Sequence, residues 1–277
     1  MPSSSKLVEN NMDIVADELY LEINRLFNEG RNIPDIIGKF LKEHNQSIND
    51  IFNWLSNQSK PKYSYILGLL YYSRIGDIGT KNAKGYYYYI RYFGTKSVKG
   101  DMYKLFLNAA NNGIIMANIF LGKCREEGRD VKKDVAKAKE FYITASNCAA
   151  AEYALGNYYY KRLKYRKAFI WLKRSAENNN RKALYLLGIF YQKAFGTNFD
   201  NNKAFESFYR AAFMGLQNSQ HELAKCYEYG EGTEKNLENA FFWYQAAMDN
   251  KHNCHNDLER VKHKLRHQDI IEEQELS

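Results

Sequence analysis

Proline is nearly absent from this chain of 277 residues. It has only 3 prolines, and the last of them is Pro61. Because proline is the residue that most strongly interrupts a helix, residues 62–277 can form long helices without a break.

Cysteine and long apolar runs are scarce as well. The four cysteines are Cys124, Cys148, Cys226 and Cys254, with no CxxC pair among them. No stretch approaches the ~18 consecutive apolar residues of a membrane span, and the opening MPSSSKLVENN lacks the apolar core of a secretory signal. These absences predict reduced thiols, no membrane span and a cytoplasmic or nuclear location.

Acidic residues are outnumbered by basic ones, giving a net charge of +8. Residues 1–60 contain 6 Lys/Arg and 9 Asp/Glu, a balance of −3, so the remainder carries +11. A solvated lysine-rich surface accounts for such an excess, and attraction of an acidic partner or of nucleic acid is the alternative.

What the chain does contain is a repeat. Four segments begin with Leu followed by Gly or Ala: LGKC at Leu121, LGNY at Leu155, LGIF at Leu187 and LAKC at Leu223. Four residues before each Leu stands a small residue, and these are Ala117, Ala151, Ala183 and Ser219. This spacing marks one face of an α-helix, here named helix A.

A second pattern, helix B, follows each of these and also occurs once before them, as MYKLFLNAA at Met102. The copies share a large apolar residue at the fifth position, namely Phe106, Tyr142, Leu172, Phe208 and Tyr244. They also share a small residue three positions later, namely Ala109, Ala145, Ser175, Ala211 and Ala247. We expect the small residues to let helices approach closely and the large ones to fill the gaps between them.

The spacing supports a true repeat. Helix B begins 17 residues after the Leu in three copies and 13 after it in the middle copy, and the regular period is 36. A single hairpin cannot bury its apolar face alone, so the hairpins are expected to stack into a superhelix.

The pattern resembles the Sel1-like repeat family, which is related to tetratricopeptide repeats. The resemblance rests on LENAFFWYQAA and on the loop YGEGTEKN at 229–236, and it covers residues ~63 to 250 in five copies. It implies an all-α fold, an α-solenoid coiled as a right-handed superhelix, and a non-catalytic adaptor or scaffold. The middle copy departs from the pattern, with KRLKYR in place of the loop glycines.

The expected boundaries follow from the register. The repeats are expected at 63–113, with an insertion at 79–98, and at 117–149, 151–180, 183–215 and 219–250. Residues 7–58 should form a helical N-terminal cap and 251–268 a C-terminal capping helix. The N-terminal stretch also resembles a segment that follows the kinase domain in some fungal Sel1-like chains. No kinase motif stands here, so no kinase activity is expected.

The insertion contains GYYYYIRYFG at 85–94, between GTKNAKG and GTKSVKG, and we interpret it as a local tandem duplication. Its tyrosine-rich part, 86–93, is compatible with a packed aromatic lobe, a peptide- or RNA-stacking platform, or an aggregation-prone segment.

Two other segments offer binding chemistry. The residues His252, Cys254, His255, His263 and His267 have spacings that could hold zinc, although a solvated face is the simpler interpretation. Cys124 and Cys226 share one helix-A slot that we expect to be buried. We therefore predict no catalytic residues, no metal and no cofactor.

The basic segment KRLKYRKAFIWLKR, 161–174, contains seven Lys/Arg and no acid. It supports an alternative function, the binding of RNA or of another acidic ligand through the edge of the middle repeat.

The main functional hypothesis is peptide binding in a groove lined by helix A. Residues at −2, +2 and +5 from each Leu lie on the helix face opposite the packing face. They are Ile119, Lys123, Glu126, Tyr153, Asn157, Tyr160, Tyr185, Ile189, Gln192, His221, Lys225 and Glu228. This mixture suits protein recognition, as in an adaptor for signalling or complex assembly.

Overall fold

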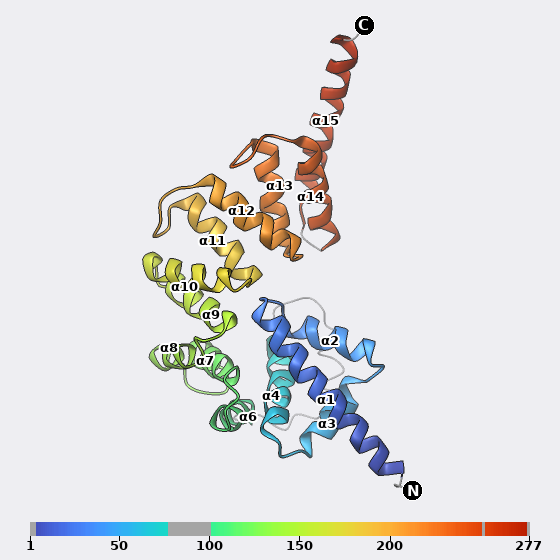
Figure 1. The fold of residues 1–277 in the computed structure, drawn as a ribbon, viewed down its shortest axis with the longest axis vertical. Helices are drawn as coiled ribbons and strands as arrows, with labels where there is room; N and C mark the ends of the chain where they lie inside the picture. Colours follow the sequence, from blue (N-terminus) through green and yellow to red (C-terminus); the bar gives the residue numbers. More distant parts are fainter. Residues whose placement is uncertain (1–3, 77–100, 251–252, 276–277) are drawn as a thin grey trace. The chain divides into compact units, whose positions relative to one another are not determined.

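The computed structural model describes residues 4–76, 101–250 and 253–275, and all regular structure in this part of the chain is helical (Figure 1). The chain divides into two compact units, Met1–Ala154 and Leu155–Ser277. The prediction of an all-α fold is confirmed. The tyrosine-rich segment at 85–94 lies outside the described residues.

Unit 1 begins with three helices outside the repeats: α1 (Ser4–Asn28), α2 (Ile33–Glu43) and α3 (Ile48–Ser56). Repeat helices follow: α4 (Pro61–Gly76), α6 (Asp101–Asn111), α7 (Ala117–Glu127), α8 (Val135–Thr144) and α9 (Ala149–Tyr160), whose last part belongs to unit 2. Helix B of the first copy, α6, packs on α4, and α8 packs on α7, as the repeat requires.

Unit 2 contains α10 (Tyr165–Glu177), α11 (Arg181–Lys193), α12 (Asn201–Phe213), α13 (Gln217–Tyr229), α14 (Leu237–Asp249) and α15 (His255–Glu275). Each of these helices packs against the next along the chain. Every helix A and helix B that the sequence predicts is therefore present, and within each unit consecutive hairpins pack on one another.

Close packing between the two helices of a hairpin depends on the glycine that follows the repeat Leu. A Cβ added at this glycine would lie less than 3.0 Å from the large helix-B side chain. The pairs are Gly68 with Phe106, Gly122 with Tyr142, Gly156 with Leu172, and Gly188 with Phe208. Real Cβ atoms do not approach other atoms so closely, so a side chain here would force the helices apart.

The loops of three repeats share one backbone path although their sequences differ. Each has two residues with positive φ, two positions apart: Gly128 and Asp130, Ala194 and Gly196, and Gly230 and Gly232. The shorter loop of the middle copy, 161–164, turns instead at Leu163, with φ of 56°. A left-handed leucine thus takes the place of the absent glycines.

The second left-handed residue of each loop lies on the start of helix B in the preceding repeat. A Cβ on Gly196 would lie 2.6 Å from the amide nitrogen of Arg166, and one on Gly232 would collide with the carbonyl of Asn201. Asp130 occupies the same place in unit 1, where its Oδ2 accepts a hydrogen bond from the Tyr103 amide at 2.9 Å. The loops therefore connect consecutive hairpins as well as the two helices of one hairpin.

We predict that Gly188→Ala lowers the free energy of unfolding by about 1–3 kcal/mol, because the new methyl group meets the Phe208 ring. Gly38→Ala in α2 is the matched control, since nothing lies within 4 Å of its added Cβ. Gly38→Ala should raise the free energy of unfolding by about 0.5–1 kcal/mol, because alanine has a higher helix propensity than glycine. Urea unfolding measures both, and equal effects of the two substitutions would contradict the packing.

Candidate interaction surface

The twelve predicted groove residues all lie on helices A, but the burial of their side chains differs from one position to the next. In unit 1, Ile119 is fully buried and cannot contact a partner. Its neighbour Phe120 stacks on Phe27 of α1, with ring centroids 5.2 Å apart. Lys123, one turn further along α7, places its ammonium group over the rings of Phe27 and Phe120.

Helix α1 makes further contacts with the helices A of unit 1. The ring of Tyr20 meets Tyr65 of α4 edge-on at 6.0 Å, and the hydroxyl of Tyr63 lies 3.0 Å from Asp17. At its end, Asn28 accepts a hydrogen bond from the Ala150 amide of α9 at 3.3 Å. Helix α1 therefore covers part of the face that the sequence predicts to be free in unit 1, at Tyr65 and Lys123.

The remaining unit 1 candidates are half-buried. Glu126 accepts a hydrogen bond from Tyr142 of α8 at 2.9 Å, and burial raises the pKa of Tyr153. Both side chains are thus partly committed to internal packing.

In unit 2, most of the candidates are likewise half-buried. Tyr185, Ile189 and Gln192 on α11 are half-buried, as is Asn157 on α9. The Gln192 amide reaches Glu231 in the loop of the next repeat at 3.4 Å. Tyr160 packs against Phe190 and Phe195, with centroids 5.3 and 6.3 Å away.

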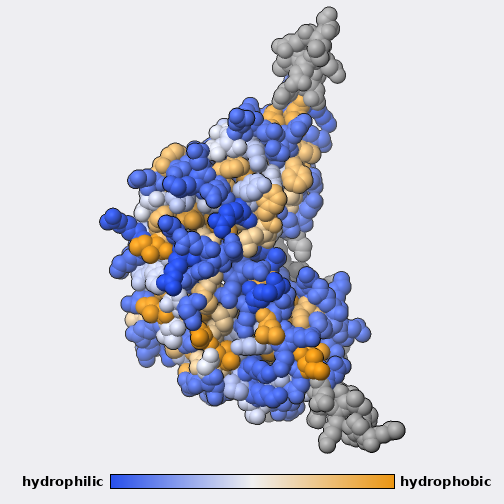
Figure 2. Space-filling view, viewed as in Figure 1, coloured by the Kyte–Doolittle hydropathy of each residue, from blue (hydrophilic) through white to orange (hydrophobic). Residues whose placement is uncertain are grey.

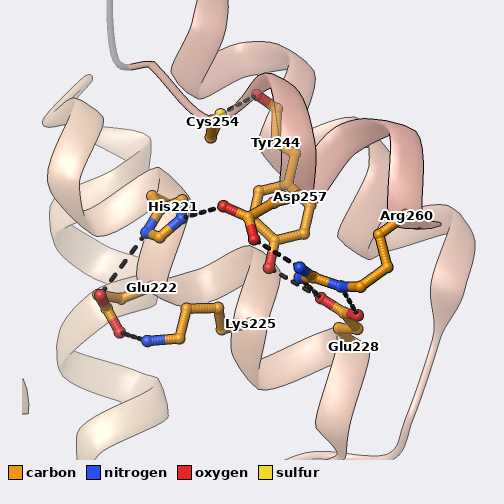
Figure 3. A network of polar contacts seen from close by, with 8 residues as sticks. All are labelled: His221, Glu222, Lys225, Glu228, Tyr244, Cys254, Asp257 and Arg260. Atoms are coloured by element: carbon orange, nitrogen blue, oxygen red, sulfur yellow. Dashed lines mark hydrogen bonds and ion pairs between the residues drawn. The ribbon is translucent and has the colours of Figure 1, made fainter. Parts of the chain in front are cut away.

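Helix α13 presents His221 and Lys225 in the slots equivalent to Tyr185 and Ile189 (Figure 3). His221 Nε2 lies 3.0 Å from Asp257 of α15, and its Nδ1 lies 3.6 Å from Glu222. Lys225 pairs with the other oxygen of Glu222 at 2.9 Å. These side chains form a charged network that joins α13 to the C-terminal helix.

Glu228 accepts hydrogen bonds from three neighbouring side chains. It is 1% exposed, so it cannot contact a partner protein. Arg260 of α15 donates two hydrogen bonds to it at 2.8 Å, and Lys264 donates a third at 2.8 Å. Tyr244 adds its hydroxyl at 2.9 Å. The C-terminal helix thus covers the last predicted groove slot.

The charges of the network stabilise one another. Burial alone would raise the pKa of Glu228, but the hydrogen bonds from Arg260, Lys264 and Tyr244 outweigh it and lower the pKa to about 2. The carboxylates of Glu222 and Asp257 raise the pKa of His221 above its usual value. The imidazolium and the carboxylates therefore favour their charged forms.

The sequence contains a signal for the Tyr–Glu contacts between helix A and helix B. Glu occupies the +5 slot of helix A only in the two copies whose helix B carries Tyr at the large position, and both pairs form the same bond at 2.9 Å: Tyr142 with Glu126, and Tyr244 with Glu228. Copies with Phe or Leu there have Tyr72, Tyr160 or Gln192 instead. The hydroxyl and the carboxylate vary together because each satisfies the other.

Among the described residues, no group of three or more His, Cys, Asp or Glu could hold a metal, and His252 of the zinc alternative lies outside them. Cys254 is buried and donates to the carbonyl of Tyr244 at 3.3 Å. Cys124 and Cys226 are buried, as predicted. No helix in the described part of the chain combines the length and apolar character needed to cross a membrane.

Comparison with known proteins identifies four repeats. The model of the family described as Sel1 repeat matches residues 115–148, 149–180, 181–215 and 217–252. The chain belongs to the Sel1 repeat family. Sel1 repeat proteins generally mediate protein–protein interactions.

Two relatives of this Sel1 repeat protein are 32% identical to it. One is a sel1-like repeat-containing protein, L21, of Acanthamoeba polyphaga mimivirus, matched over 44% of this chain and 23% of its own. The other is DAP3-binding cell death enhancer 1 of Rattus norvegicus, matched over 58% of this chain and 34% of its own. The chain thus spans about a third or less of the length of these relatives.

Among solved structures, a protective antigen of uropathogenic Escherichia coli strains displays an SLR fold similar to this Sel1 repeat protein. The TM-score is 0.60 at 21% identity, over 77% of this chain and 44% of the antigen. The likeness establishes the fold.

The network of Figure 3 predicts a bell-shaped dependence of stability on pH. Because the folded state raises the pKa of His221, its contribution is complete below pH ~6.5 and is lost as the pH rises through the folded value. Because the folded state lowers the pKa of Glu228, its contribution is present above pH ~4.5 and is lost as the pH falls toward 2.

Thermal unfolding between pH 2 and 9 tests this, with His221→Gln as the matched variant. In the variant, the unfolding temperature should fall less above pH ~6.5 than in the wild type, and it should fall as before at acidic pH. An unchanged alkaline limb in His221→Gln would contradict the assignment.

Proposed function

We propose that this Sel1 repeat protein is a non-catalytic scaffold that binds an extended segment of a partner protein along the helix-A face of unit 2. The proposal includes a cytoplasmic or nuclear location and a role in signalling or complex assembly.

The observation that carries the proposal is that helices A of unit 2 have one buried face and one partly exposed face. The repeat positions Leu187 and Leu223 are buried in the packing between helices. The slots on the other face remain partly exposed and repeat in register, as Tyr185 with His221 and Ile189 with Lys225. Tyr185 and Ile189 pack in part against the core of unit 2, and His221 pairs with Asp257, so the exposed part of each side chain is what a partner would contact.

The chemistry of these side chains suits a peptide. Tyr185 offers a large contact area at little cost in conformational entropy, and Ile189 adds an apolar contact. Gln192 and Lys225 can bond the backbone carbonyls or carboxylates of an extended segment. The rat relative, whose name describes it as DAP3-binding, is consistent with protein binding as the general role of such repeats.

A library of random peptides selected on the full chain provides the test. Peptides that bind the wild type should lose about tenfold or more in affinity for Tyr185→Ala and for Ile189→Ser, since each removes contact area from the proposed surface. Isothermal titration measures the affinities, and thermal melting verifies that each variant is folded.

Tyr209→Ala on α12 is the matched control, because Tyr209 is 40% exposed but lies on a helix B. It should change the affinity by less than twofold or so. Selected peptides that depend on Tyr209 and ignore both helix-A variants would show that partners bind elsewhere.

A further inference from the structure

The basic segment of the middle repeat is not used by the proposed function, and the structure shows how its charges are arranged. Arg166, Lys167, Lys173 and Arg174 are exposed on α10, and Ile170 among them is 63% exposed. At ~100° per residue, these five side chains lie within about 120° of one another. The four cations therefore surround one exposed isoleucine, one turn before it and one turn after it.

This arrangement, here named the α10 cationic face, extends into the preceding loop. Lys161 and Lys164 are exposed there, and Leu163 between them is 71% exposed. The equivalents of Ile170 in the other four repeats are Lys104, Glu140, Glu206 and Phe242, none of which has four cations around it. The face is thus a property of one repeat and is not demanded by the fold.

Acidic groups are few around it. Lys173 pairs with Glu177 at 4.0 Å, at the far end of the helix, but no ion pair within the described residues involves Arg166 or Lys167. The first turn of α10 also lacks the side-chain acceptor that Asp134, Asp200 and Asn236 supply to the other helices B of repeats 2, 4 and 5. The positive charge of Arg166 and Lys167 at the start of α10 is therefore little compensated.

We propose that the α10 cationic face is a second docking surface, for an acidic protein segment that carries aliphatic side chains among its carboxylates. Charge complementarity fixes the acidic character of the partner. Ile170 and Leu163 are exposed apolar side chains, and burying them against aliphatic side chains of a partner is favourable. We therefore expect aliphatic residues between the acidic ones.

A protein segment fits this face better than RNA does. Recognition of single-stranded RNA relies on exposed aromatic faces on which bases stack. The rings here are engaged internally: Tyr165 stacks on Phe195 at 4.4 Å, and Phe169 meets Tyr191 edge-on at 5.6 Å. Trp171 has the Arg174 guanidinium 5.8 Å from its ring.

The test uses the full chain and three fluorescent probes of similar charge. The first is a peptide with isoleucine and leucine spaced among glutamates, the second has serine at the apolar positions, and the third is oligouridine. The main variant is Arg166→Glu with Lys167→Glu. Glutamate in the first turn of a helix supports folding, so this variant should remain folded.

The first peptide should bind the wild type and lose about tenfold or more in affinity on the double reversal. The control variant, Lys132→Glu with Lys133→Glu, makes the same charge change at two exposed lysines of another repeat and should have little effect. Ile170→Ser should weaken the first peptide about threefold or more and leave the second unchanged.

The proposal is overturned if the serine peptide binds as tightly as the first, if both double variants weaken binding equally, or if oligouridine binds more tightly than either peptide. Tyr185→Ala should leave this binding intact, so the result is independent of the surface proposed on helix A.

Discussion

The constraint on which the structure depends is the fit of one large helix-B side chain into the gap left by a glycine on helix A. Phe106, Tyr142, Leu172 and Phe208 all meet such a glycine, and Ala224 takes the glycine's place opposite Tyr244. The fit sets the separation of the two helices in each hairpin, and the loops then place one hairpin on the next. With the packing face committed in this way, functional variation is confined to the other faces of the helices. Most of the surface seen in Figure 2 is hydrophilic, with hydrophobic residues in small separate groups.

The non-repeat helices decide how much of the helix-A face is available. Helix α1 lies on α4 and α7 in unit 1, where Phe27 covers Phe120 and Lys123. Helix α15 ends the stack of unit 2 through the ion pairs of Arg260 and Lys264 with Glu228. Both helices contact slots that a partner would otherwise contact, so α1 and α15 limit the surface proposed for binding.

The repeat helices and their pairing could be predicted from the sequence because side-chain size recurs at fixed spacing, and size is what helix packing selects. The burial of Ile119 and Glu228 could not be predicted in this way. Glu228 is covered by α15, and the neighbour of Ile119, Phe120, packs on α1, and both covering helices lie outside the repeat register. The turn at Leu163 could not be predicted either, because a leucine with positive φ has no sequence signal comparable to glycine. The positions of the helix-A slots were predictable, but their accessibility was not.

The most direct test of the packing constraint is the effect of Gly188→Ala in two backgrounds. In the wild type, the added methyl group meets the Phe208 ring and should destabilise the protein. In a Phe208→Ala background the ring is gone, so the same substitution should stabilise the protein by about 0.5–1 kcal/mol through helix propensity. Urea unfolding of the four proteins measures this coupling. A reversal of sign would confirm that the ring fills the gap left by the glycine, whereas effects that agree within about 0.5 kcal/mol in the two backgrounds would contradict it.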